Sequence, residues 1–117
     1  MTGTSPTVNS AAWAFTDRDG RIESSSRGMS SVLGVGRLRR GDDLLNLLPL
    51  PRKALRHDID AALRGWPVCR TMLIAAPGLR ERQVRYRVSR RLEEGGDGLF
   101  WLLDELSAAA LVVTASA

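Results

Sequence analysis

Few residues of this sequence have the type and spacing that chemistry requires. The single histidine, His57, and the single cysteine, Cys69, lie too far apart to form a metal-ligand motif. The carboxylate pairs Asp42-Asp43 and Glu93-Glu94 fall in expected caps or loops, with no histidine or apolar pocket beside them to perturb their pKa values. We therefore expect no catalytic residue, no metal site and no enzymatic activity.

Length and composition indicate one globular domain. The chain has 117 residues, of which 44% are hydrophobic and 26% charged. Its apolar run at 108–113 is far shorter than the ~20 residues that cross a bilayer. Residues 1–6 have neither the basic flank nor the apolar core of a secretory signal. A single cysteine excludes an internal disulfide. We expect a cytoplasmic protein without a membrane partner.

The net charge of +4 raises the question of a nucleic-acid partner. All the basic residues except Lys53 are arginines, and they are scattered from Arg18 to Arg91 among thirteen acids. A surface that follows a phosphate backbone needs clustered charge, with aromatic platforms for single strands. The pattern favours a solvated surface, so we expect no nucleic-acid partner. A basic nucleic-acid-binding α+β domain is kept as a second alternative.

The elements that must position any site follow from hydrophobic periodicity and turn residues. Residues 1–10 are expected to form a flexible tail, and a hairpin is expected from strands at 11–16 and 21–25. A short helix should follow the serines at 24–26 and end at Gly34, because its apolar residues have helical spacing.

The rest of the chain predicts two more helices and three strands. A short helix is expected over 42–48 with Asp42 as its cap, and a longer amphipathic one over 51–64. The strands are expected at 69–76, 82–90 and 99–104, the last two joined by a glycine-rich loop at 95–98. Residues 107–117 fit a helix, a strand or a linker. The class is α+β.

The order of these elements and several short motifs resemble the PAS domain, a small sensor module, over residues 11–106. The motifs are Asp17-Arg-Asp-Gly20-Arg-Ile22, Leu33-Gly34, Gly41-Asp-Asp-Leu-Leu45, Gly65 and Asp104. Serines replace the family's asparagine before the first helix, and Glu105-Leu106 replaces Ile-Thr after Asp104. The resemblance implies a five-stranded antiparallel sheet with short helices on one face. Residues 107–117 would be a linker or the start of a signalling segment.

Two cofactors of the family can be tested on the sequence. Flavin-photoadduct members carry a reactive cysteine in the short middle helix, but residues 42–48 contain none, and Cys69 lies on a strand. We expect Cys69 to be a small, partly buried residue. Haem-binding members use a histidine of the long helix, but His57 lies about 200° around that helix from Leu55 and Ile59. We therefore expect neither a thiol–flavin adduct nor haem.

Strand alternation predicts two functional faces of the sheet. The face toward the helices would be a filled apolar core, which we favour, or a pocket for a small apolar, planar or weakly polar ligand. A charged ligand is disfavoured, because this lining would leave its polar groups unpaired. Its residues would be Leu55, Ile59, Leu63, Met72, Ile74, Val84, Tyr86, Val88, Phe100 and Leu102. The opposite face would be covered by a second copy or a flanking helix. Its residues would be Leu73, Ala75, Arg85, Arg87, Leu99, Trp101 and Leu103.

The sequence thus predicts a cytoplasmic PAS-type sensory and dimerisation domain of a bacterial protein. Its output would be a histidine kinase or a transcription factor. The first alternative is a ligand-free protein–protein interaction module, which the absence of any co-purifying small molecule would indicate.

Overall fold

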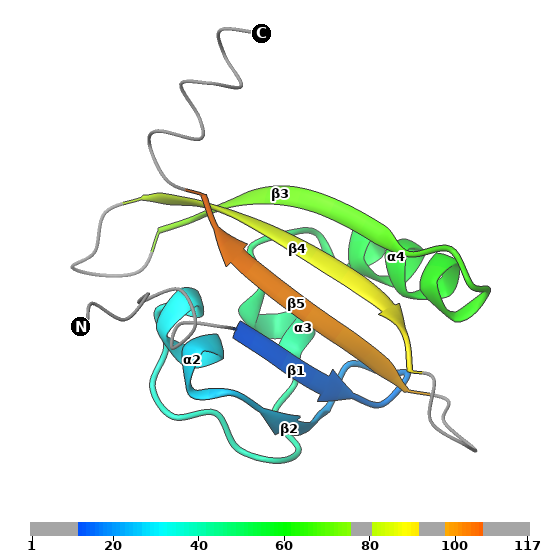
Figure 1. Cartoon of the computed structure of the whole chain (residues 1–117), viewed down its shortest axis with the longest axis horizontal. Coiled ribbons are helices and arrows are strands. Elements are labelled where there is room, and N and C mark those ends of the chain that lie inside the picture. The colour runs from blue at the N-terminus through cyan, green and yellow to red at the C-terminus, as the bar shows by residue number, and fades with distance from the viewer. Residues whose placement is uncertain (1–11, 76–80, 92–97, 107–117) are drawn as a thin grey trace, which may run out of the picture.

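A computed structural model describes residues 12–75, 81–91 and 98–106. They form a five-stranded antiparallel sheet with the strand order β2-β1-β5-β4-β3 (Figure 1). The strands are β1 (Ala12–Thr16), β2 (Ile22–Ser25), β3 (Val68–Ile74), β4 (Arg82–Arg90) and β5 (Leu99–Glu105). The predicted α+β class and antiparallel sheet are confirmed.

Three helices lie between β2 and β3 in the sequence, and they pack on one face of the sheet. They are α2 (Arg27–Leu33), α3 (Leu44–Leu47) and α4 (Arg52–Leu63). In Figure 1 the strands lie in front of α3 and α4, so the viewer faces the side of the sheet that these helices leave uncovered. Helix α4 contacts β4 most, while α2 contacts β1 and β5.

The short polar segments fold much as their residue types predict. Asp17 organises the β1–β2 turn, because its Oδ1 accepts the amides of Asp19 and Arg21 at 2.9 Å each. Helix α2 ends at Gly34, whose φ of 70° is the left-handed conformation typical of a C-cap. The predicted cap of α3 was off by one residue: Asp43, not Asp42, accepts the amide of Leu45, at 3.0 Å.

The orientation predicted for the last strand was wrong. Leu99, Trp101 and Leu103 are buried against the helices, with exposed fractions of 0–1%, whereas Phe100 and Leu102 lie half-buried on the other face. The sequence prediction had placed each of these five residues on the wrong face of the sheet. Because β5 is apolar on both faces, its own alternation does not indicate which side points inward.

The pairing of β5 with β4 determines this orientation. Val88 lies opposite Trp101 and Tyr86 opposite Leu103, and directly opposed residues of an antiparallel pair point to the same face. The hairpin closes where the Arg91 amide donates to the Gly98 carbonyl at 3.0 Å. A slip of one residue there would turn every β5 side chain to the other face. The sequence showed the loop but not this register.

Parts of the predicted organisation lie outside the described residues. These are the tail at 1–10, the loop residues 95–97 and the segment 107–117. Within the described ranges, no helix is long and apolar enough to span a membrane.

Candidate functional site

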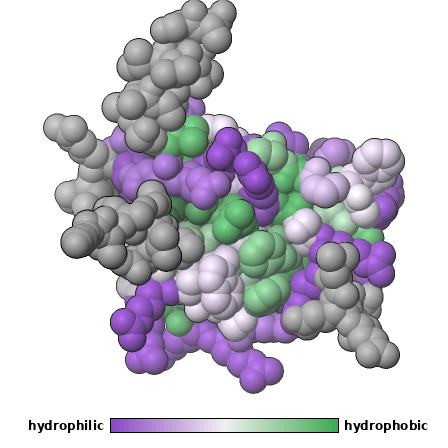
Figure 2. All heavy atoms as spheres, viewed as in Figure 1, coloured by the Kyte–Doolittle hydropathy of each residue, from purple (hydrophilic) through white to green (hydrophobic). Residues whose placement is uncertain are grey.

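The face of the sheet away from the helices carries a cluster of apolar side chains, which we call the outer patch. It consists of Trp13 and Phe15 from β1 and Phe100 and Leu102 from β5, all half-buried. The register sets Phe15 opposite Phe100 and Trp13 opposite Leu102. The Phe15 ring lies 5.5 Å from that of Trp13 and 5.1 Å from that of Phe100. The two strands thus present one continuous, largely aromatic surface. Figure 2 shows this face of the molecule, with green and pale spheres in its middle and hydrophilic purple ones around them.

Charged side chains flank the outer patch at both ends. Arg91 lies over the Phe15 ring, 4.8 Å from its centroid, and its Nη1 is 2.6 Å from Glu23 Oε1. Toward the other end, Arg85 Nη2 lies 3.5 Å from Asp104 Oδ2. Each end therefore carries one base and one acid. Arg87, opposite Leu102 on β4, is exposed beside the patch.

The predicted interface divides between the two faces. Leu73, Ala75, Arg85 and Arg87 are indeed exposed or half-buried on the sheet surface, with Leu73 54% exposed. Leu99, Trp101 and Leu103, which were expected on this outer face, are in the core instead. Phe100 and Leu102 of the same strand lie on the outer face in their place. Trp13 and Phe15 were recognised as sharing one face of the first strand but were not assigned to the interface.

Eight of the ten residues predicted to line an interior pocket belong to a packed core or lie at its edge. Leu55, Ile59, Val84, Tyr86 and Val88 are 0% exposed, so no space large enough for water touches them. Met72 and Ile74 are nearly as buried, and Leu63 is partly buried at the edge of the core. The two predicted members from β5, Phe100 and Leu102, lie on the outer face. Trp101 lies inside, its ring 5.8 Å from that of Tyr86.

A polar cluster lies at the edge of this core, formed by the buried Asp58 of α4 and Tyr86 of β4 and by Arg70 of β3, whose side chain is 45% exposed. Asp58 is 1% exposed and accepts two hydrogen bonds from Arg70, at 2.5 and 2.8 Å. The Tyr86 hydroxyl donates to the same carboxylate. Burial raises the pKa of Asp58, but the hydrogen bonds from Arg70 and Tyr86 outweigh it and hold the pKa below its usual value. The cluster is a satisfied ionic link between helix and sheet.

This polar cluster was not predicted, although the sequence carries a signal for it. Asp58 lies three residues after Leu55 and four before Ala62, which places it on the buried stripe of α4. Tyr86 supplies the hydroxyl of the predicted interior. A carboxylate on an apolar stripe needs such a partner, since an unpaired buried charge is costly.

Two residues considered for cofactors are both exposed. The His57 side chain is 81% exposed, which confirms that it points away from the core. Cys69 is exposed on β3 opposite Arg87, so the expectation that it is partly buried was wrong. It lies on an edge strand, whose outer face no described helix covers. No group of three His, Cys, Asp or Glu side chains in the described ranges could hold a metal ion.

Comparisons with known proteins locate the chain by its fold. No family model and no curated protein matches the sequence. The PAS domain of an HTR-like protein from Haloarcula marismortui superimposes with a TM-score of 0.66 at 14% identity, covering 82% of this chain and 86% of that one. The PAS domain of Bordetella pertussis BvgS gives 0.65 at 14% identity, covering 93% and 86%.

A third similar structure is a larger protein. Vibrio cholerae VqmA, solved bound to DPO, gives a TM-score of 0.68 at 13% identity, and the match covers 88% of this chain but 55% of VqmA. At such identities the likeness shows the fold alone.

Proposed function

Because the chain has the PAS fold, we propose that it is a sensory and dimerisation domain of a bacterial, cytoplasmic signal-transduction or transcription-regulatory protein. The outer patch is the observation that carries this proposal. Contiguous apolar surface on a soluble domain commonly marks an interaction site, and aromatic residues and arginine are enriched at such sites. The similar structures add support, since VqmA is described as a dimer among LuxR-type receptors.

We infer that the patch is covered by a second copy of this chain. A two-fold axis running across the strands would place the end that carries Glu23 and Arg91 over the partner's end that carries Arg85 and Asp104. Each arginine would then face an acidic side chain of the partner, around an apolar centre. Because each end carries one acid and one base, the charges at the rim are complementary to those of a second copy, and the apolar centre supplies the contact.

The sensory part of the proposal concerns what the domain detects. The closely packed core supports a module that works without an interior ligand, because five of the predicted lining residues expose no surface. A small apolar ligand between sheet and helices is the other candidate, favoured by the apolar lining. It would require the core to open, and an absorption or native mass spectrum of purified protein distinguishes the two.

Sedimentation velocity over a dilution series tests the dimer. We expect a reversible dimer for the wild type, and a dissociation constant at least about tenfold higher for Phe100→Asp, since a charge in an apolar contact costs more than ~1.4 kcal/mol. Trp66→Asp is the matched control, because Trp66 is 71% exposed and remote from the patch. It should dimerise as the wild type does.

Two results would overturn the interface. One is a wild type that stays monomeric at every concentration. A monomer whose patch is covered by a terminal segment of its own chain would give this result and would equally overturn the dimer. The other is a Phe100→Asp variant that dimerises as tightly as the control. Circular dichroism of each variant confirms that it is folded.

A further inference from the structure

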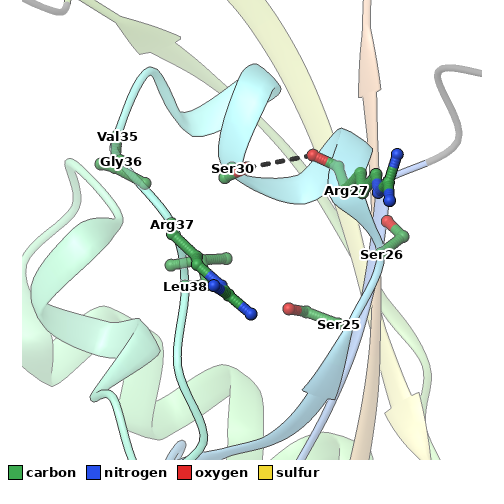
Figure 3. A pocket seen from close by; sticks show the side chains of 8 residues that line it. All are labelled: Ser25, Ser26, Arg27, Ser30, Val35, Gly36, Arg37 and Leu38. Atoms are coloured by element: carbon green, nitrogen blue, oxygen red, sulfur yellow. Dashed lines mark hydrogen bonds between the residues drawn. The ribbon is translucent and has the colours of Figure 1, made fainter.

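An open pocket lies among helix α2, the end of strand β2 and the segment 35–38, on the side of the molecule that carries α2 (Figure 3). Its volume is about 710 Å³, within the range of small-molecule sites. The residues that line it are Ser25, Ser26, Arg27, Ser30, Val35, Gly36, Arg37 and Leu38. None belongs to the outer patch or to the predicted interior pocket.

Two side chains offer hydrogen-bond donors to this pocket. Figure 3 shows the Arg37 guanidinium and the Ser25 hydroxyl directed toward each other across the open space. Neither side chain has a hydrogen-bond or ion-pair partner among the residues that the structure describes. Ser30 differs, because its hydroxyl already donates to the Arg27 carbonyl at 3.0 Å. The Arg27 guanidinium also borders the pocket but points away from Arg37 and Ser25 in Figure 3, so Arg37 and Ser25 are the donors directed into the open space.

The backbone of the same segment adds further donors. The Val35 amide donates to the Ser30 carbonyl, whereas those of Gly36, Arg37 and Leu38 make no hydrogen bond within the described ranges. Successive unpaired amides are typical of anion-binding segments. The segment that borders the pocket therefore has backbone amides that no described residue satisfies.

No acidic side chain of the described part of the chain lines the pocket. The aspartates of the adjoining surface, Asp42 and Asp43, are already engaged. Asp42 accepts the Arg39 amide at 2.7 Å, and Asp43 accepts the Leu45 amide and pairs with Arg52 at 2.7 Å. The local charge is positive, and nothing among these residues competes for Arg37.

From this arrangement we propose that the pocket binds the oxyanion group of a small ligand, either a phosphate or a carboxylate. Arg37 and Ser25 donate to its oxygens, a guanidinium being well suited to planar or tetrahedral oxyanions. The half-buried side chains of Val35 and Leu38 contact the remainder of the ligand. This site is independent of the proposed dimer contact and does not rest on it.

Amide chemical shifts measured during titration test the site. The probes are inorganic pyrophosphate and citrate, each added to ¹⁵N-labelled protein at constant ionic strength. We expect saturable shifts concentrated at Ser25 and residues 36–38. Tighter binding of pyrophosphate assigns the site to phosphate ligands, and tighter binding of citrate assigns it to carboxylates. Absence of saturable shifts with both probes overturns the proposal.

A pair of variants separates a built site from general charge attraction. Arg37→Gln should weaken binding by about tenfold or more, since a hydrogen bond to a charged group is worth about 1.5–3 kcal/mol. Arg40→Gln removes the same charge from an exposed residue three positions after Arg37 that does not line the pocket. It should retain nearly full affinity. An equal loss in both variants would mean that the anion is attracted only by net charge.

Discussion

The two faces of strands β1 and β5 have similar hydrophobicity, but they differ in how closely their side chains pack and in whether the tryptophan on each face has a hydrogen-bond acceptor. On the inner face, Ala12, Ala14 and Thr16 lie opposite Leu103, Trp101 and Leu99, so small residues leave room for a large ring. Trp101 is completely buried, and its indole donates to the buried Thr16 hydroxyl at 2.9 Å.

On the outer face, the aromatic side chains contact one another in edge-on and tilted arrangements and remain half-exposed. The comparison shows that hydrophobicity alone does not select the buried face. Space beside the ring and a partner for its polar atom decide where tryptophan lies. The outer face offers its tryptophan neither a closed space nor, among the described residues, a hydrogen-bond acceptor, so this is the face available to a second protein chain.

Truncating one tryptophan on each face should give the largest contrast. Trp101→Ala is expected to lower the free energy of unfolding by about 3–5 kcal/mol, because it leaves a cavity in a closed core. Trp13→Ala should cost clearly less in dilute, monomeric protein, because Trp13 is already half-exposed. Urea unfolding of both variants measures the difference. A larger loss for Trp13 would reverse our assignment of the two faces.

The partly exposed cluster around the buried Asp58 should give a smaller, pH-dependent effect on the inner face. Asp58→Asn is expected to destabilise by about 1–3 kcal/mol, because the Arg70 and Tyr86 donors lose their shared carboxylate. Since the pKa of Asp58 is lowered by folding, its contribution is complete above the unfolded pKa of about 3.9 and is lost as the pH falls through the folded value.

The stability difference between wild type and Asp58→Asn should therefore shrink as the pH falls below about 4. Asp60→Asn, an exposed carboxylate on the same helix, is the control and should change stability by less than about 0.5 kcal/mol. A difference between wild type and Asp58→Asn that stays constant down to pH 2 would contradict the ionic role of Asp58.

The elements of the fold could be predicted because each depends on local residue types. The strict alternation around Val84, Tyr86 and Val88 predicted both the bounds of β4 and its inward face. The orientation of β5 depends on one hairpin register across a loop, which no local pattern specifies. Cys69 was misplaced because β3 is an edge strand and its outer face has no cover among the described residues.

The candidate sites likewise divide into features that local sequence patterns indicate and features that depend on tertiary structure. The idea of an apolar outer face came from the alternation of the last strand, but none of the four patch residues was assigned to it. Phe100 and Leu102 were placed on the inner face, and Trp13 and Phe15 come from a strand distant in the sequence. The donors around Arg37 and Ser25 could not be foreseen, because segments 25–30 and 35–38 meet only where the chain turns back after α2. Proximity of this kind is a property of the tertiary structure.

The dimer through the outer patch is tested most directly by a distance between two copies. Cys69 is the only cysteine, is exposed and lies on the same side of the sheet as the patch, so a spin label can be attached to the native chain. Pulsed dipolar spectroscopy should then show a defined label-to-label distance in the wild type, retained in Trp66→Asp and lost in Phe100→Asp. Absence of dipolar modulation in the wild type, or the same distance in Phe100→Asp, would contradict the proposed dimer.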